Sequence, residues 1–480
     1  MPSASNGNSK ALERPLLPQE DVPSLGCREE GLTQSQTLSP QQSSLLGFTC
    51  DSEGCGNGGA ICNVAVTAIG AGMLALPKAM ERVGVILGFT LFGTVCLLTY
   101  FSSSIIIRYA SRRGKRTYSE LIEGEFGLTG ARVLQTSIII HVSGVMIVYL
   151  IIIADMLVGA APEWHGVLPT LLDRHDGVWF LSRPFVCAVL LVVAIAPMLI
   201  SRELTVVARY SRNSIIMMLF LSSTMITLAG VALWQGKAAA IHILPTPLDP
   251  KCASGCGTLV SMCVAILSVL SVSCLAFTCQ FNLLPVHLSL KDGRCSNMLS
   301  ITRKAIALCA ALYGTVAISG YIMFGKNTQG DVLRNLTIRY VSTLVHPVLA
   351  SVLIDFIVLA TTFNLLVNFV LKVWAVRESV SEMFYGLPAL ELSLPRFYLL
   401  TYGLSLAAYL TSVFIPSVWV MLSLVGSTAC VTFSYIFPGL IMARNGKTRL
   451  GRVGGGSTVI MAVVMATVAI TNTLSGHADL

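Results

Sequence analysis

The chain has 480 residues, of which 54% are hydrophobic and only 12% are charged. Soluble domains carry roughly 25% charged residues, so this composition excludes an ordinary soluble globular protein. The net charge of +8 does not indicate nucleic-acid binding, because the basic residues lie between apolar runs, where they set the orientation of a membrane protein.

The chain begins with a polar tail. Residues 1–56 are rich in Ser, Gln, Pro and Glu, and nothing in them resembles a cleavable signal peptide. So little apolar surface cannot drive folding, and we therefore expect a disordered cytosolic tail. Residues 57–474 are expected to form one transmembrane domain, and residues 475–480 a short tail on the non-cytosolic side.

Apolar runs recur along the rest of the chain. Each is long enough to cross a hydrocarbon core of ~30 Å, so the sequence predicts an all-α membrane protein with about eleven transmembrane helices. They are expected at 60–80, 84–107, 133–160, 184–201, 213–234, 258–286, 303–324, 342–371, 396–415, 417–442 and 455–474.

Lys and Arg cluster in alternate connections between these segments, for example at Arg112 and Arg113 and again at Lys447. The positive-inside rule places these connections, and the N-terminal tail with them, in the cytosol. The odd helix count then places the C-terminus on the other face, together with the glycosylation sequon at Asn335. The membrane is either a vacuolar or other endomembrane, or the plasma membrane.

Two cysteines share a loop on the predicted non-cytosolic side. Cys252 and Cys256 would form a disulfide there in an oxidising compartment, and two free thiols are the alternative. No His lies near them, so a metal site is not expected. Most other cysteines fall inside apolar segments, where they pack as small apolar residues.

The first segment contains Gly70, Gly72 and Pro77, which together loosen the backbone in the middle of the membrane. A broken helix is tolerated there if its freed amides line a cavity or meet a ligand. Close packing of helices through small residues is the alternative. The sixth segment has a similar disturbance over residues 271–285, which turn from apolar to polar and end in proline. Paired interruptions of this kind indicate an inverted-repeat transporter whose binding site lies between them.

Two acidic residues lie well inside the apolar segments. Asp155 is near the non-cytosolic end of the third segment, and Asp355 is nearer the centre of the eighth. A carboxylate is costly in lipid, so each is a candidate functional residue. For Asp155 the alternative is a structural acid that pairs near the interface. For Asp355, pairing with a neighbouring helix and a proton-linked role are equally open.

The stretch from Asn63 to Pro77 resembles the first helix of the amino acid/auxin permease family. The branches of this family include the sodium-coupled neutral amino acid transporters of animals and the vacuolar-type amino acid transporters of fungi and plants. The resemblance extends over residues 57–474 and is stronger to the plant vacuolar-type branch. Further stretches that carry it are 149–155, 320–325, 331–333, 414–419 and 436–438.

This resemblance implies the fold of the bacterial leucine transporter, in which two inverted repeats of five helices are followed by one extra helix. It also implies an amino acid substrate held at the two breaks. The substrate carboxylate would meet the backbone of Ile69, Gly70, Ala71, Gly72 and Met73. The amine would meet carbonyl groups of the sixth segment around Leu275, Phe277 and Thr278.

The sequence departs from the family pattern at two positions that bear on the coupling ion. Val66 stands where sodium-coupled relatives have an Asn ligand, and an apolar side chain cannot coordinate a hard cation. Gln280 replaces a His found in many relatives. Thr361 and Thr362 are candidate ion ligands, although paired threonines also serve in helix packing. We therefore expect a proton, rather than sodium, as the coupling ion, with Asp355 and Asp155 as candidate carriers.

The expected function is secondary active transport of amino acids, by symport or export. The alternatives are a membrane amino acid sensor with little transport and a sodium-coupled symporter. The chain shows no catalytic residue motif and no cofactor or metal site, so an enzyme is not expected. The expected partners are the amino acid and the lipid bilayer, with no nucleic acid and with a monomer as the transport unit.

Overall fold

The computed structural model describes residues 56–160, 164–171, 179–200, 205–243, 258–387, 389–415, 417–446 and 449–474. The predicted N-terminal tail up to residue 55, the C-terminal tail 475–480 and the loop that holds Cys252 and Cys256 lie outside these ranges.

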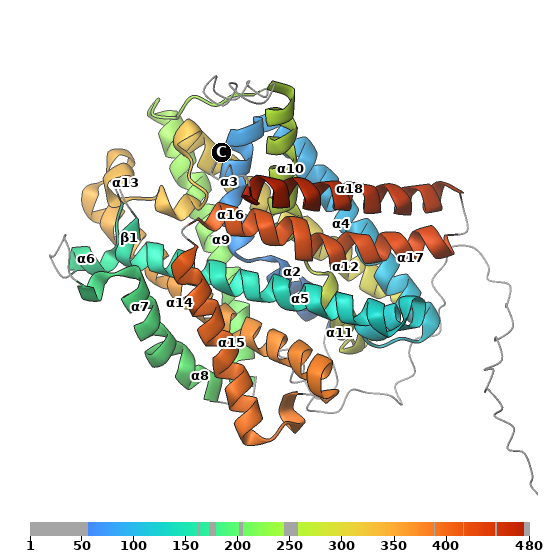
Figure 1. Cartoon of the computed structure of the whole chain (residues 1–480). Helices are drawn as coiled ribbons and strands as arrows, with labels where there is room; N and C mark the ends of the chain where they lie inside the picture. The colour runs from blue at the N-terminus through green and yellow to red at the C-terminus, as the bar shows by residue number, and fades with distance from the viewer. Residues whose placement is uncertain are drawn as a thin grey trace, which may run out of the picture.

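The described chain is helical, with one short β ladder (Figure 1). Strand β1 (Gly159–Ala160) pairs antiparallel with β2 (Trp164–His165). The α-helices are α2 (Asn57–Ala68), α3 (Leu76–Val83), α4 (Val85–Arg113), α5 (Tyr118–Val158), α6 (Val167–Leu171), α7 (Arg183–Leu190), α8 (Ala196–Ile200), α9 (Thr205–Trp234), α10 (Thr258–Ala276), α11 (Leu283–Leu288), α12 (Cys295–Phe324), α13 (Ile338–Leu344), α14 (Pro347–Tyr385), α15 (Leu394–Phe414), α16 (Val418–Val425), α17 (Phe437–Asn445) and α18 (Arg449–Leu474).

Shorter helical turns connect several of these helices. The 3₁₀ turns are η2 (Ala71–Ala75), η3 (Trp179–Leu181), η6 (Gln280–Asn282), η7 (Gly325–Asn327), η8 (Val332–Arg334) and η9 (Ala389–Glu391). Three π-helical turns, η4 (Leu191–Ile195), η10 (Gly426–Cys430) and η11 (Thr432–Ile436), join their flanking α-helices without a break in direction.

The predicted helical architecture is confirmed. Within the described ranges, nine helices are long and apolar enough to cross a membrane, and a bent pair raises the number to ten. A shorter apolar helix at Gly451–Thr467 corresponds to the last predicted segment. Each predicted segment thus coincides with a helix or a pair of helices.

Two of the membrane helices are interrupted, as the sequence predicts. The first is bent by 54° between Asn57–Ala68 and Ala71–Val83. The second is broken between the end of α10 at Ala276 and the start of η6 at Gln280, and it resumes as α11. Each interruption is followed by a 3₁₀ turn and then by a short α-helix that contains a proline, so the two halves of the chain repeat the same irregularity.

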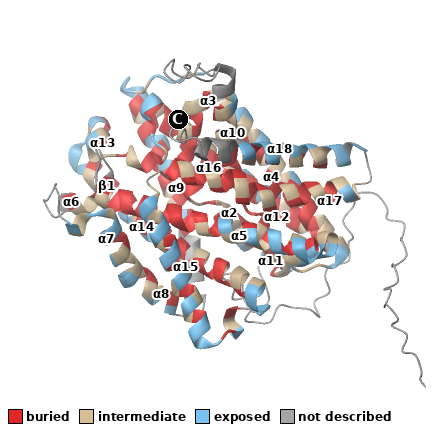
Figure 2. Cartoon of the chain, in the orientation of Figure 1, coloured by how far each residue is buried: buried red, intermediate tan, exposed pale blue. Residues whose placement is uncertain are grey.

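Several of the long helices form two groups, and α9 packs against both of them. Helices α2, α3, α4, α10 and α12 pack on one another and contain both interruptions; we call them the bundle. Helices α5, α7, α14 and α15 form the second group, the scaffold, with α5 and α14 in extensive contact. Figure 2 shows buried residues concentrated in central helices such as α5 and α16, whereas α7, α8 and α15 expose much of their surface.

Helix α5 is longer than predicted because an N-terminal portion precedes its membrane segment. The two portions meet at Gly127, whose φ of 73° only glycine adopts at little cost. Glu125, just before this break, pairs with Arg113 at 3.0 Å and accepts a hydrogen bond from Asn445 at 2.7 Å. This side chain therefore ties the ends of α4 and α17 to the start of α5.

Candidate functional site

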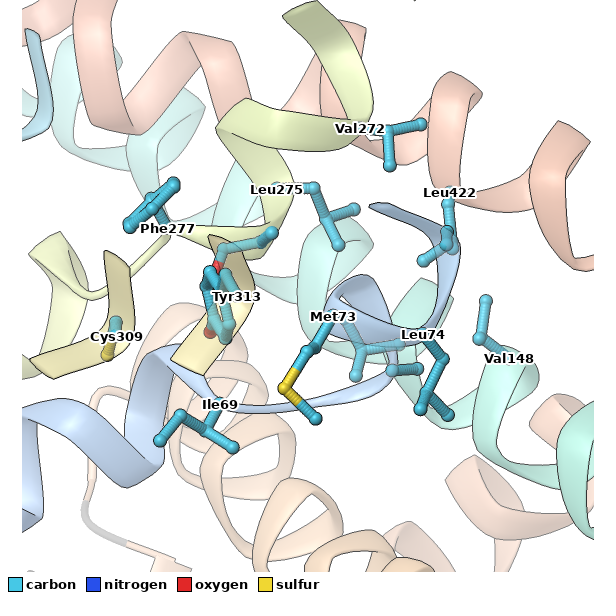
Figure 3. Packing of buried hydrophobic residues seen from close by; sticks show 14 of the residues in the cluster. Ile69, Met73, Leu74, Val148, Val272, Leu275, Phe277, Cys309, Tyr313 and Leu422 are labelled. Atoms are coloured by element: carbon cyan, nitrogen blue, oxygen red, sulfur yellow. The ribbon is translucent and has the colours of Figure 1, made fainter. Parts of the chain in front are cut away.

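The two helix interruptions lie against each other. A Cβ atom added to Gly72 would lie 2.9 Å from Ala276 Cα, so only a residue without a side chain permits this approach of the two backbones. Figure 3 shows the side chains of Met73, Leu275 and Tyr313 gathered between the two interruptions. The structure therefore brings together the two stretches that the sequence predicts to form one site.

The helix 1 side of this site is the start of the half-helix Ala71–Val83. Gly70 precedes it as the N-cap residue and supplies no side-chain hydrogen bond. The first amides of a helix have no partner within it, and they carry a partial positive charge. Ile69, Ala71 and Met73 are at most 2% exposed. A substrate carboxylate at this position would thus meet amide groups in a dry environment.

The helix 6 side offers carbonyl groups, some of which already have partners. Tyr313 Oη donates to the carbonyl of Ala276 at 2.9 Å, and the amide of Thr278 donates to the carbonyl of Leu275 at 3.2 Å. A carbonyl oxygen accepts two hydrogen bonds, so an amine can share the oxygen of Ala276 with Tyr313. The Thr278 side chain donates instead to the carbonyl of Cys274, in the last turn of α10, at 2.8 Å.

Two tyrosines at this site were not predicted from the sequence. Tyr149 on α5 is 1% exposed, and its hydroxyl would lie 2.9 Å from a Cβ atom at Gly70. Within the described part of the chain its hydroxyl makes no hydrogen bond. Tyr313 on α12 reaches the other interruption, as described above. A hydroxyl-bearing aromatic residue within an apolar run was the available signal, since such a group needs a polar partner when buried.

Gln280 anchors the second interruption to two other helices. Its Nε2 donates to Ser102 of α4 at 3.1 Å, and Ser434 of η11 donates to its Oε1 at 3.1 Å. The amide of Cys279 donates to the same Oε1 at 3.0 Å. An amide side chain, which does not titrate, thus fixes the backbone turn after α10.

The structure places the two intramembrane acids in different surroundings. Asp155, in the last turn of α5, is fully buried, with Arg183 at 2.5 Å and Arg334 at 3.6 Å from its carboxylate oxygens. Asp355 makes no hydrogen bond or ion pair to any described residue. It is half-buried and lies near the start of α14, rather than near its centre as expected, since α14 continues to Tyr385.

Neighbours of Asp355 along the helix face outward. Val352 and Leu359, which lie on either side of it on the same face, are 61% and 57% exposed. Thr361 and Thr362 are buried on the same helix, and Thr362 Oγ1 has no hydrogen-bond partner among the described residues. Val66 on α2 is 6% exposed and gives an ion no oxygen ligand from its side chain.

The sequence profile of the family described as transmembrane amino acid transporter protein matches residues 55–475. The chain is 28% identical to amino acid transporter AVT6E of Arabidopsis thaliana, over 88% of this chain and 83% of that protein. It is 26% identical to a Rattus norvegicus protein provisionally named sodium-coupled neutral amino acid transporter 11, over 79% and 76% of the two chains.

Among solved structures, a mutant manganese transporter of Eremococcus coleocola superposes with a TM-score of 0.57, over 94% of this chain and 91% of that one. At 14% identity this likeness shows the fold alone. It agrees with the predicted inverted-repeat transporter fold. The relatives are carriers and not enzymes, as expected, and the match across nearly the whole transmembrane region establishes that the chain belongs to the transmembrane amino acid transporter family.

Proposed function

We propose that this protein moves an amino acid across a membrane by alternating access, and that it holds the amino acid between the two helix interruptions. The close approach of Gly72 and Ala276 carries this proposal, because it brings the interrupted helices of both repeats together at one buried place. There the substrate carboxylate meets the amides at the start of Ala71–Val83, and the amine meets carbonyl groups around Leu275 to Thr278.

The proposed coupling ion is a proton. Val66 offers a sodium ion no side-chain oxygen on α2, and the two positive charges beside Asp155 suit an acid that stays ionised as part of the structure. Asp355 has no such partner among the described residues, which leaves it as the candidate to carry the transported proton. The proposed orientation has the N-terminus in the cytosol, as the distribution of Lys and Arg indicates.

Uptake by the purified full-length chain in proteoliposomes tests this function. A panel of amino acids is offered with an imposed proton gradient and, separately, a sodium gradient. We expect uptake that follows the proton gradient and that falls by more than tenfold in Gly72→Ala. It should persist in the control Gly403→Ala, where an added Cβ meets nothing within 4 Å. Strict dependence on sodium would refute the proton scheme, and binding without flux would favour a sensor.

Asp355→Asn tests the proton carrier separately. This variant keeps the shape and hydrogen-bonding capacity of the side chain but cannot titrate. It should preserve the exchange of amino acid across the membrane and lose accumulation driven by the proton gradient. An unchanged response to pH in a well-folded Asp355→Asn protein would exclude this residue.

A further inference from the structure

The segment 325–336, which we call the covering segment, lies over the first helix interruption. Its turn η8 packs on both η2 and α5. Val332 and Leu333 are at most 3% exposed, and a Cβ at Gly320 would touch both Pro77 of α3 and Val332. A Cβ at Gly330 would lie 3.0 Å from Trp419 Cβ, which places this segment against α16 as well. It thus closes one end of the proposed site, on the face predicted to be non-cytosolic.

A buried carboxylate holds the turn of this segment. Asp331 is fully buried, and its Oδ1 accepts a hydrogen bond from the Leu333 amide at 2.9 Å, which caps η8. Its Oδ2 is also buried and receives no hydrogen bond from any described residue. A carboxylate oxygen without a donor is costly inside a protein, and protonation of the group removes most of that cost.

Three charged side chains lie around Asp331, namely one acid and two arginines. Asp155 and Arg334 act directly on its carboxyl group, and Arg183 pairs with Asp155 from the other side. Turn η2 has no titratable side chain. The titratable side chains at the end of α12 and in η7 are Tyr321 and Lys326.

The charged residues of α3 have partners of their own. Lys78 and Glu81 pair with each other at 2.7 Å, and Arg82 lies over the ring of Trp419 on α16 at 4.7 Å. The charges that set the protonation of Asp331 are therefore those of Asp155 and Arg334.

We propose that Asp331 is a proton-binding site, and that the covering segment takes up one proton from its own side of the membrane when it closes over the first helix interruption. The proposal rests on the transport function proposed above and assigns a proton site apart from Asp155 and Asp355.

The physical basis is the change in surroundings of Asp331. In the closed segment, burial, and to a lesser degree the charge of Asp155, raise the pKa of Asp331 from 3.8 to about 7, although the Leu333 amide and Arg334 act in the opposite direction. When the segment moves away, Asp331 meets water and its pKa returns toward ~4. The closed form thus binds the proton more tightly. Between these two pKa values, each unit by which the pH falls on that side raises the equilibrium constant for closure by up to about tenfold.

The first test measures amino acid exchange by the full-length chain in proteoliposomes, with pH varied only on the side of the covering segment. The rate or apparent affinity of exchange should change as that pH falls from about 8 to about 5, with a midpoint near the pKa of Asp331. Asp331→Asn, which mimics the protonated acid and still caps η8, should abolish this dependence and hold exchange at its acidic value. Asp331→Ser, another capping residue, gives a second variant that does not titrate.

Two neighbours should move the midpoint in opposite directions. Arg334→Gln removes a positive charge and should shift it to higher pH, whereas Asp155→Asn removes a negative charge and should shift it to lower pH, each by about one unit. Asp292→Asn, at an exposed acid paired with Arg294 between α11 and α12, should leave the profile unchanged.

The second test does not need transport. Trp419 is 6% exposed beneath the covering segment, so quenching of its fluorescence by iodide reports opening. The Trp419→Phe protein supplies the background. Quenching should rise with pH in the parent but not in Asp331→Asn. If quenching depends on pH in the parent but not in Asp331→Asn, and no amino acid is exchanged, the result supports the proton site and refutes the proposed transport function. If exchange occurs and both profiles persist in Asp331→Asn, the proton site is refuted.

Discussion

Gly70 and Gly72 lie two residues apart, yet the structure predicts different consequences for the same change to alanine. A Cβ at Gly70 would lie 2.9 Å from Tyr149 Oη, the far end of a side chain, with the ring carbons of Tyr149 no nearer than 3.9 Å. A Cβ at Gly72 would instead lie 2.9 Å from a backbone atom, Ala276 Cα. The clash at Gly70 is with a hydroxyl that Tyr149→Phe removes, whereas the clash at Gly72 is with a backbone atom that no substitution removes.

Overpacking of this kind costs about 1–3 kcal/mol. We expect Gly70→Ala to lose stability within that range and to regain most of it when combined with Tyr149→Phe, because the ring carbons at 3.9 Å are in ordinary contact. Gly72→Ala should lose at least as much and should not be restored by Ala276→Gly, since Ala276 Cα remains in place. Transport should fall by more than tenfold in Gly72→Ala, because the two interruptions must separate for the Cβ to fit.

The assay is a double-variant cycle on the thermal unfolding midpoint of the purified protein, with proteoliposome exchange measured in parallel. Gly93→Ala is the matched control, since a Cβ there meets nothing within 4 Å. If Gly70→Ala and Gly72→Ala both behave like Gly93→Ala, the two interruptions do not touch as described. If Tyr149→Phe fails to restore Gly70→Ala, the conflict lies elsewhere.

Further outcomes follow from single contacts. Gln280→Ala removes one hydrogen bond from each of two buried serine hydroxyls, Ser102 and Ser434, so we expect a loss of about 1–3 kcal/mol by thermal unfolding, with reduced exchange. Glu125→Gln weakens the pair with Arg113 and should lower the unfolding midpoint without changing substrate preference. The raised pKa of Asp331 means that the folded chain binds this proton more tightly than the unfolded chain. The parent should therefore lose stability relative to Asp331→Asn as pH rises from about 4 to about 7, and no further above that. Finally, a glycan on Asn335, lost in Asn335→Gln, would confirm the predicted orientation.

The interruptions were predictable because their causes are local. Gly70, Gly72 and Pro77 alter the backbone where they stand, and the polar run before Pro285 does so in the second repeat. The membrane segments were equally predictable, since a run of apolar residues long enough to span lipid rarely occurs outside a membrane helix. Both features depend on neighbours in the chain, and the structure confirms them.

The contacts of the candidate site could not be predicted in this way. Gln280 meets Ser102 and Ser434, which are 178 and 154 residues away in the sequence, and no local pattern encodes such distant partners. The two acids show a similar limit. Asp155 and Asp355 both stand in apolar runs, and such a run is apolar on every side, so its periodicity does not show which face meets lipid and which meets an arginine.

The π-helical turns η10 and η11 lie between α16 and α17, and they change the direction in which the side chains after them point. Each such turn holds one residue more than an α-helix of the same rise, and side chains beyond it are rotated by about 100° relative to a regular helix. Ser434 and Tyr435, which contact Gln280 and Thr99, owe their direction to this offset. Deleting one residue between Gly426 and Ile436 would thus keep a continuous helix and yet turn both side chains away from their partners.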